Sequence, residues 1–205
     1  MNNSLTICRI EDSPFSFKDV IDLIHDSFQE RLDQGLHFTC SSLTVDQYES
    51  NTKDGPVIVA YNSESSLLLG TLSGHLFVDN DNVSYAYIEY LAINNTVKRT
   101  GLATELLLKM QELMAEFEAA YMISDTACSA KSSVSWHLKN GFRYVALRSY
   151  RSTNYYSFVF RKQLVGVSKW DNWLYRNCRF SLSCAKTVLK WTKNGKERLW
   201  FKLFR

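Results

Sequence analysis

The sequence of 205 residues has no long hydrophobic run. A helix that spans a bilayer needs about 18–20 consecutive apolar residues, and no segment approaches this length. The first residues, MNNSLTICRIEDS, also lack the basic and then apolar layout of a secretory signal. We therefore expect no transmembrane helix, and a cytoplasmic location.

Metal-binding and disulfide patterns are also missing. The five cysteines (Cys8, Cys40, Cys128, Cys178, Cys184) are odd in number and none forms a C-x-x-C pair. With four scattered histidines they give no zinc-ligand spacing, so we expect reduced thiols and no bound metal. Repeats and low-complexity segments are absent too. Apolar residues make up 45% and charged residues 22%, which is typical of a globular protein.

Charge changes abruptly along the chain. Residues 1–164 hold 14 Lys and Arg against 19 Asp and Glu, whereas residues 165–205 hold 10 against 2. This step predicts a domain over residues 1–164 and a basic, aromatic extension over 165–205. Within the extension, Asn194-Gly195 separates two β-prone runs, 187–193 and 196–201, and predicts a hairpin with a type I′ turn.

The order of hydrophobic patterns predicts a mixed α/β fold. Serine and threonine residues at Ser16 and Thr44, each followed three residues later by Asp19 or Gln47, indicate two helix starts. Gly141 lies where the end of a further helix favours glycine. The expected strands cover residues 5–10, 57–61, 67–78, 83–93, 121–126, 144–150 and 155–164. We expect a central sheet of about six to seven strands, flanked by helices.

The most informative segment is a strand that leads into a helix through a basic turn. The strand Tyr85–Ile93 is followed by Asn94–Ala103, and a helical stripe of apolar residues then begins at Leu102. The N-terminus of such a helix presents unpaired N–H groups and a positive dipole to an anion. Gly101 permits close approach, and Lys98 and Arg99 add positive charge. The alternative interpretation is an ordinary helix start with a solvated basic pair.

This turn, Lys98-Arg-Thr-Gly101-Leu-Ala103, resembles the R/Q-x-x-G-x-G/A motif of the GNAT superfamily of N-acetyltransferases. The preceding Tyr90–Ile93 is similar to the fourth strand of that family, and Ser133–Phe142 resembles its later helix, which ends in Gly-Phe. The resemblance covers residues 5–164 in order. It departs from the family at Lys98 and Ala103, which stand in place of the usual Arg or Gln and the second Gly.

The resemblance implies a GNAT acyltransferase fold that uses acetyl-CoA as co-substrate and no metal. The pantetheine and pyrophosphate contacts would come from Leu91, Ala92, Ile93, Lys98, Arg99, Thr100, Gly101, Leu102, Ala103 and Thr104. A bulge at Leu91–Ile93 would direct a backbone N–H at the thioester oxygen. The asparagine that the family usually has before its later helix is replaced by Ala130, so that pantetheine contact is in question.

Two residues are the candidates for proton transfer. Glu89 lies among apolar and aromatic residues of the strand, and we predict it as the general base; the alternatives are a structural ion pair or a grip on a cationic substrate. His137 stands where the family often has a tyrosine that protonates the leaving thiolate, so it is the predicted general acid. Its alternative is an exposed histidine without a partner. Cys128 is a weaker candidate, for the role of nucleophile. The sequence places no obvious base for its thiol, and direct transfer to the amine needs no acyl-enzyme.

The acceptor is less defined. The segment Phe28–Tyr48 would shape the acceptor side, and its Glu30, Arg31, Asp33 and His37 suit a polar molecule with a cationic amine. We expect a small-molecule primary amine, with a nucleotide amino sugar among the candidates; a protein or peptide amine and a catalytically inert acyl-CoA sensor are the alternatives. The extension would cover the sheet or form a homodimer contact, meet a membrane surface, or bind an anionic partner. The net charge of +3 gives nucleic acid binding little support.

Overall fold

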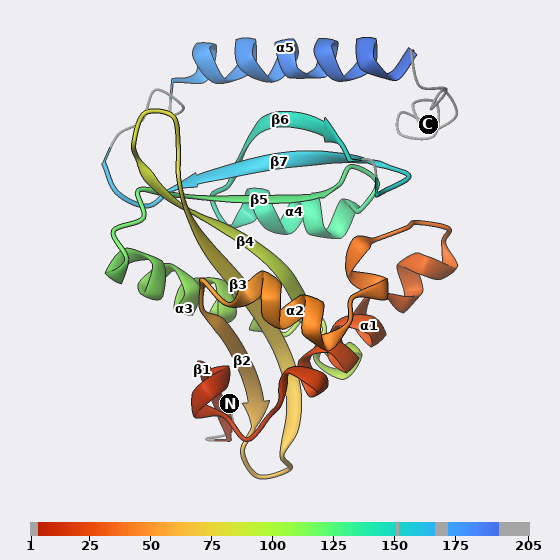
Figure 1. Cartoon of the computed structure of the whole chain (residues 1–205), viewed down its shortest axis with the longest axis vertical. Helices are drawn as coiled ribbons and strands as arrows, with labels where there is room; N and C mark the ends of the chain where they lie inside the picture. The colour runs from red at the N-terminus through yellow and green to blue at the C-terminus, as the bar shows by residue number, and fades with distance from the viewer. Residues whose placement is uncertain (1–3, 151, 167–171, 193–205) are drawn as a thin grey trace. The chain divides into compact units, whose positions relative to one another are not determined.

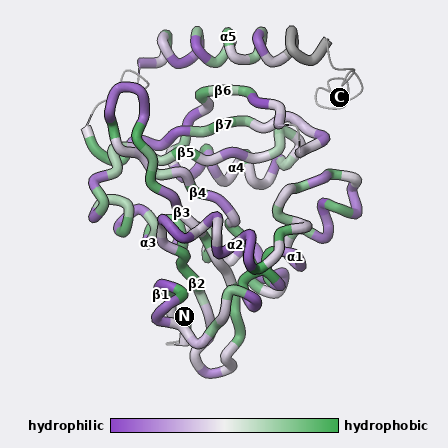
Figure 2. The backbone as a smooth tube through the Cα atoms, viewed as in Figure 1, coloured by the Kyte–Doolittle hydropathy of each residue, from purple (hydrophilic) through white to green (hydrophobic). Residues whose placement is uncertain are grey.

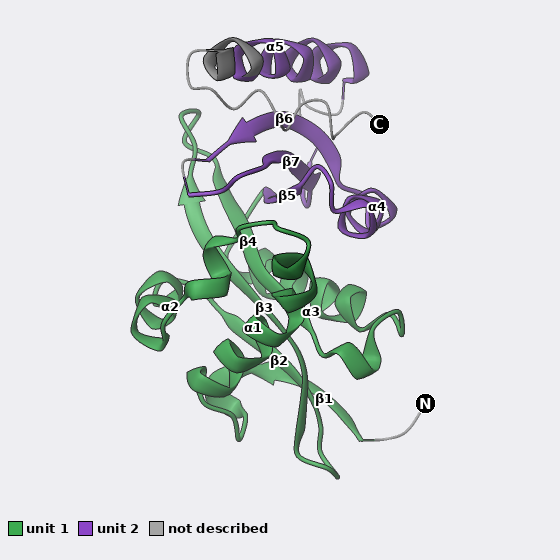
Figure 3. Ribbon diagram, turned by 90° about the vertical axis from the view of Figure 1, so that its right-hand side faces the viewer, with its two compact units in different colours: residues 1–120 green, residues 121–205 purple. Residues whose placement is uncertain are grey.

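The computed structural model describes residues 4–150, 152–166 and 172–192, and of residues 188–192 only the backbone. The chain forms two compact units, residues 1–120 and 121–205 (Figure 3). Seven strands lie in the described ranges, four in the first unit and three in the second. This matches the predicted mixed α/β class. The predicted boundary between a domain over residues 1–164 and an extension over residues 165–205 stays a prediction.

The first unit contains an antiparallel sheet with the strand order β1-β2-β3-β4 (Figure 1). The strands are β1 (Leu5–Arg9), β2 (Val57–Asn62), β3 (Leu67–Val78) and β4 (Ser84–Ile93). The helices are α1 (Phe17–Asp33), α2 (Val45–Thr52) and α3 (Leu102–Glu116). Short 3-10 helices cover Ile10–Asp12, Thr39–Ser42 and Asn95–Val97.

Capping boxes begin α1 and α2 as the sequence predicts. The side chain of Ser16 accepts a hydrogen bond from the Asp19 N–H, and the Asp19 carboxylate accepts one from the Ser16 N–H. Thr44 and Gln47 make the same reciprocal pair at the start of α2. These bonds satisfy N–H groups that have no partner within the helix, which is why both helices begin at these residues.

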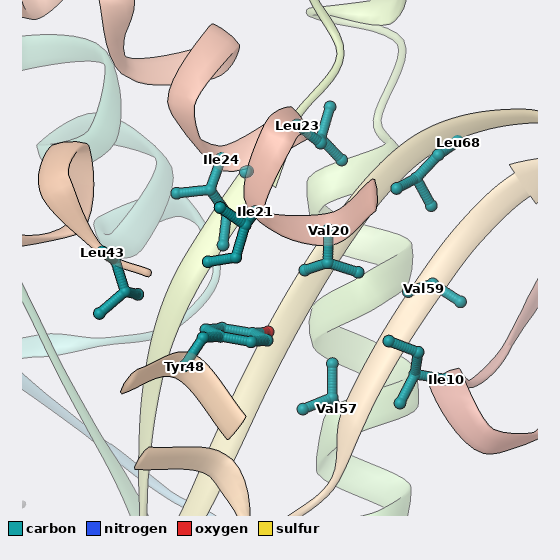
Figure 4. Close-up of a cluster of buried hydrophobic side chains, with 11 residues drawn as sticks. Ile10, Val20, Ile21, Leu23, Ile24, Leu43, Tyr48, Val57, Val59 and Leu68 are labelled. Carbon is teal, nitrogen blue, oxygen red and sulfur yellow. The ribbon is translucent and has the colours of Figure 1, made fainter. Parts of the chain in front are cut away.

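The helices of the first unit pack on opposite faces of its sheet. In β3, the Ser73 side chain meets the buried Tyr48 hydroxyl of α2 at 2.7 Å, while a side chain at the neighbouring Gly74 would strike Met110 and Met114 of α3. Successive residues of a strand point to opposite faces, so α2 and α3 lie on different sides. The core on the α1 and α2 side gathers residues such as Val20, Ile24 and Val59 (Figure 4).

The second unit contains a three-stranded antiparallel sheet with the order β5-β7-β6. The strands are β5 (Tyr121–Ala127), β6 (Arg143–Ser149) and β7 (Tyr156–Gln163), and the helices are α4 (Lys131–Lys139) and α5 (Trp173–Thr192). Helix α4 is followed by Gly141 at φ +84°, a left-handed conformation that confirms the predicted helix end.

Helix α5 corrects the predicted hairpin. Residues 187–192, expected as its first strand, continue the helix, and the rest of the predicted hairpin lies outside the described residues. Figure 2 shows hydrophilic and hydrophobic residues interspersed along α5. Phe180, Ser183 and Thr187 recur at helical spacing and contact β6 or β7. This half-buried face packs against the sheet, and the contact is one that a helical spacing of these residues allows.

Helix α5 packs along β6, the last strand in the order of the sheet. Ser183 Oγ accepts a hydrogen bond from the Leu147 N–H at 3.1 Å and donates one to the Leu147 carbonyl at 3.0 Å. These backbone groups of an edge strand would otherwise invite another strand to pair. In the described part of the extension, the structure therefore favours the first of the alternatives, a segment that covers the sheet. None of the described helices is both long and apolar enough to cross a membrane.

Candidate active site

A β-bulge interrupts the pairing of β3 with β4. Thr71 pairs with Ala92 and Ser73 pairs with Glu89, so that Tyr90 and Leu91 together oppose one residue of β3. Tyr90 has a φ of +55°, which a residue with a side chain rarely adopts. Such a bulge releases backbone groups from the ladder and redirects them. The bulge expected from the family resemblance at Leu91–Ile93 is present, centred one or two residues earlier.

Glu89 lies directly before the bulge and contacts a histidine of the neighbouring strand. His75 Nε2 is 2.9 Å from Glu89 Oε1, an ion pair when the imidazole is protonated. His75 Nε2 is shielded from solvent. It lies close to Glu89 Oε1, but the geometry of this contact is not that of a hydrogen bond. The His75 side chain is only 10% exposed, whereas that of Glu89 is 32% exposed. One oxygen of the Glu89 carboxylate thus contacts the buried His75, while the carboxylate remains partly accessible to solvent.

Aromatic and polar side chains from α1, α2 and the Thr39–Ser42 segment lie near Glu89. The Tyr90 hydroxyl accepts a hydrogen bond from Asn51 Nδ2 at 3.1 Å, and its ring packs against Tyr48. Burial, with the Glu89 charge as a second cause, raises the pKa of Tyr90 to about 12. Burial likewise raises the pKa of Cys40 to about 12, so this thiol is protonated at neutral pH. Sequence reasoning did not identify His75 or Cys40 as neighbours of Glu89.

Arg31 belongs to the same region. Its guanidinium lies over the rings of Phe28 and Phe38, 5.6 and 5.8 Å from their centroids. Its charge lowers the pKa of Cys40, against the larger effect of burial. The predicted acceptor segment Phe28–Tyr48 therefore supplies both an aromatic surface and a cation near the strand that carries Glu89.

The turn between β4 and α3 is where the sequence predicts an anion cradle. Gly101 is the N-cap of α3 at φ +99°, where a side chain would meet no atom within 4 Å. Glycine is required here by the left-handed backbone rather than by crowding. No side chain caps α3, in contrast to α1 and α2. The first N–H groups of α3 thus lack the side-chain acceptor that helix starts usually have, which suits a bound phosphate.

The remaining predicted cofactor residues surround this turn. Lys98, Arg99 and Thr100 are exposed, whereas Leu102 is buried in the core at the start of α3. Lys98 Nζ lies 3.7 Å from Glu30 of α1, and Thr100 Oγ1 donates to the Val97 carbonyl. Arg99 is left-handed at φ +68°. Leu91, Ala92 and Ile93 continue β4 up to the turn, and Ser27 of α1 donates to the Ile93 carbonyl.

His137, the predicted general acid, is a buried residue of α4 in the second unit. It is 3% exposed, its Nδ1 is 2.7 Å from the Ser133 carbonyl, its Nε2 is 3.0 Å from Ser124 Oγ, and its ring stacks on Phe160. Burial lowers its pKa to about 4. It is therefore neutral at pH 7 and unsuited to giving up a proton there, nor is it the exposed histidine of the alternative interpretation. The environment of His137 therefore does not suit the predicted role of general acid.

Burial also shifts the pKa of other titratable groups in the second unit. Burial raises the pKa of Cys128 and of Tyr156 to about 12, and it also raises the pKa of Tyr144. Cys128 is thus protonated at neutral pH and is not an activated nucleophile. Within the part of the chain that the structure describes, no three His, Cys, Asp or Glu side chains gather in a way that would hold a metal ion.

A bulged strand, a carboxylate beside the bulge and an uncapped glycine turn all lie within the first unit, among the residues for which the sequence predicts an acyltransferase site. The model of the acetyltransferase (GNAT) family matches residues 17–142, which is more than half of the chain. The chain belongs to this family of acyltransferases. No significant match exists among curated protein sequences.

Solved structures with the same fold have little sequence in common with the chain. A chain of the NatC complex bound to Gag peptide and CoA has 13% identity and a TM-score of 0.64, covering 79% of this chain and 99% of that one. Ard1 from Thermoplasma volcanium has 15% identity and a TM-score of 0.60, with 80% and 99% covered. PaiA N-acetyltransferase from Thermoplasma acidophilum, in complex with coenzyme A, has 16% identity and a TM-score of 0.60, with 78% and 99% covered.

Proposed function

We propose that this protein transfers an acetyl group from acetyl-CoA to a primary amine of a small molecule. The observation that carries the proposal is the β4 bulge, which lies between a held carboxylate at Glu89 and the uncapped start of α3. One strand and one turn thus bring together the two needs of the reaction, a proton acceptor and an anion cradle.

Acetyl-CoA supplies the acetyl group as a thioester. The first N–H groups of α3 would hold its pyrophosphate, with Lys98 and Arg99 adding charge. The backbone released at Tyr90 and Leu91 would donate to the oxygen that becomes negative as the amine attacks. These are contacts of the main chain, so the substitutions of Lys for Arg or Gln at 98 and of Ala for Gly at 103 are compatible with them.

Glu89 would remove the proton from the acceptor. A simple alkyl amine is mostly protonated at neutral pH, and only its neutral form attacks a carbonyl carbon. The Glu89 carboxylate accepts that proton, while His75 contacts its Oε1 and holds its orientation. The neutral amine would then attack the thioester carbon directly, without an acyl-enzyme. The new C–N bond forms as the C–S bond breaks, and CoA leaves as its thiolate, which takes a proton from solvent.

The surroundings of Glu89 support a small acceptor. The Glu89 carboxylate is only partly exposed, and Tyr90, which packs on Tyr48, and the half-buried Cys40 lie near it. Arg31 adds a cation that would suit an acceptor carrying a negative group as well as an amine. A protein or peptide amine remains the second candidate acceptor, and an inert acyl-CoA sensor is the alternative outside catalysis.

The test compares Glu89→Gln with Glu64→Gln, a matched loss of one exposed carboxylate in the turn between β2 and β3. Acetylated product is measured by mass spectrometry with acetyl-CoA and a panel of small amines, nucleotide amino sugars and peptides. We expect Glu89→Gln to lower kcat/KM by about 10²–10⁴-fold, with CoA affinity unchanged, and Glu64→Gln to have wild-type rates. Wild-type protein that binds CoA but acetylates no amine would favour the sensor, and product only with peptides would favour the second candidate.

A further inference from the structure

A pocket lined by cations opens in the second unit. It has a volume of about 390 Å³ and is lined by Gly141, Arg143, Val145, Arg161, Lys162, Gln163 and Arg176. Four of these seven side chains are cationic, and among these lining residues none is a carboxylate. The volume is within the range of small-molecule sites.

Two of the arginines are forced together by the strand register. Arg143 of β6 pairs directly with Arg161 of β7, a cross-strand arrangement that places like charges close to each other and destabilises the sheet. Burial lowers the pKa of the neighbouring Lys162. Arg176 comes from α5 and reaches the same pocket. A bound anion would offset the repulsion between these groups.

The guanidinium groups are held in place before any ligand arrives. The Arg161 guanidinium carbon lies 3.3 Å from the centroid of the Tyr121 ring, and its Nη2 donates to Gln163 Oε1 at 3.1 Å. Gln163 is itself fixed by a hydrogen bond from its Nε2 to the Val165 carbonyl. Arg143 Nη1 donates to the Phe142 carbonyl at 3.0 Å. Since these side chains are already ordered, a ligand pays less entropy on binding.

We infer that this pocket is a binding site for a small molecule that carries phosphate groups. Planar guanidinium groups match two oxygens of a phosphate at once, and three of them on β6, β7 and α5 surround one volume. The pocket lies at the end of β6 and β7 opposite to the connection between them, because Arg143 begins β6 and Gln163 ends β7. Its lining residues all belong to the second unit, whereas the α3 cradle is made of residues of the first unit.

The test is calorimetric titration of the full-length protein with pyrophosphate at constant ionic strength. We expect saturable binding at the pocket in the wild type, beside any binding at the α3 cradle. The affinity of the pocket should fall about tenfold or more in the double variant Arg143→Gln/Arg176→Gln, since each lost charge-assisted hydrogen bond is costly. Arg148→Gln is the matched control, because Arg148 is an exposed arginine of β6 outside the pocket. It should bind as the wild type does. If the double variant does not fold, Arg143→Gln alone takes its place, since this residue is exposed.

A second control separates this site from the α3 cradle. Lys98→Gln/Arg99→Gln should leave pyrophosphate binding at the pocket intact. The inference is overturned if the wild type shows no saturable binding, if Arg148→Gln weakens binding as much as the pocket variants, or if only the cradle variant does. Citrate in place of pyrophosphate tests the chemistry, and equal affinity for the two would overturn the assignment to phosphate.

Discussion

Substitution of Gly101 by alanine tests the anion cradle through a single atom. Gly101 has φ +99°, and the added methyl group would meet nothing within 4 Å. The change therefore introduces backbone strain without a steric clash. A left-handed conformation costs a residue with a side chain about 1–2 kcal/mol. For a chain of this length, that corresponds to a fall in Tm of about 2–8 °C.

Gly35 provides a matched control at the end of α1. It also has a positive φ, +78°, and its added methyl group would also meet no atom within 4 Å. We expect Gly35→Ala and Gly101→Ala to lower Tm by similar amounts, because the same kind of strain is introduced. Only at Gly101 does relief of the strain move the first N–H groups of α3.

The assay is CoA affinity by calorimetry, beside thermal melting of each variant. Gly101→Ala should weaken CoA binding by about tenfold, equivalent to one charge-assisted hydrogen bond of about 1.5 kcal/mol, whereas Gly35→Ala should bind CoA as the wild type does. If both variants lose stability and both keep full CoA affinity, the start of α3 does not hold the phosphates. The proposed role of the turn would then be wrong.

Three further predictions concern folding. Gly55→Ala should destabilise the protein far more than Gly35→Ala in a urea titration, because its methyl carbon would lie 1.8 Å from the Gly74 carbonyl oxygen; equal losses would contradict the steric reasoning. The pKa of His137 is lowered to about 4 from 6.5, so its contribution of about 3 kcal/mol is present above pH 6.5 and is lost as the pH falls toward 4. His137→Gln should flatten that part of the stability profile, and an unchanged slope would refute the assignment. Ser183→Ala should lower stability by about 1–2 kcal/mol because the Leu147 N–H loses its acceptor, while the Leu147 carbonyl keeps its hydrogen bond from Thr187. Ser181→Ala, at an exposed position of the same helix, should have little effect on melting.

Local patterns predicted the elements of this protein well where one segment contains all the information. The capping residues Ser16 and Thr44, the helix end at Gly141 and the strand, turn and helix from β4 to α3 depend on contacts within a few residues. The interactions that stabilise these features join residues only a few positions apart, so a short sequence pattern is enough to predict them. The family resemblance also placed the bulge in β4, within two residues of its observed position.

Contacts between distant segments were beyond such patterns. His75 faces Glu89 because β3 pairs with β4 across a bulge, and a shift of one residue in that register would turn His75 to the other face. Burial lowers the pKa of His137, and two of the residues around its ring, Phe160 and Ser124, come from two different strands. The helical state of residues 187–192 was missed because a two-residue turn signal is visible in the sequence, whereas the surface of β6 that α5 covers is not.

The sequence by itself determined the order of helices and strands, the glycine turn before α3 and the family, since these depend on short motifs and on hydrophobic periodicity. Only the tertiary structure decided which side chains meet. The partner of Glu89, the burial that keeps His137 neutral and the gathering of Arg143, Arg161 and Arg176 around one pocket all follow from strand register and helix packing. The burial of a side chain and its distance from other charges depend on residues far apart in the sequence, so they are set only once the chain has folded.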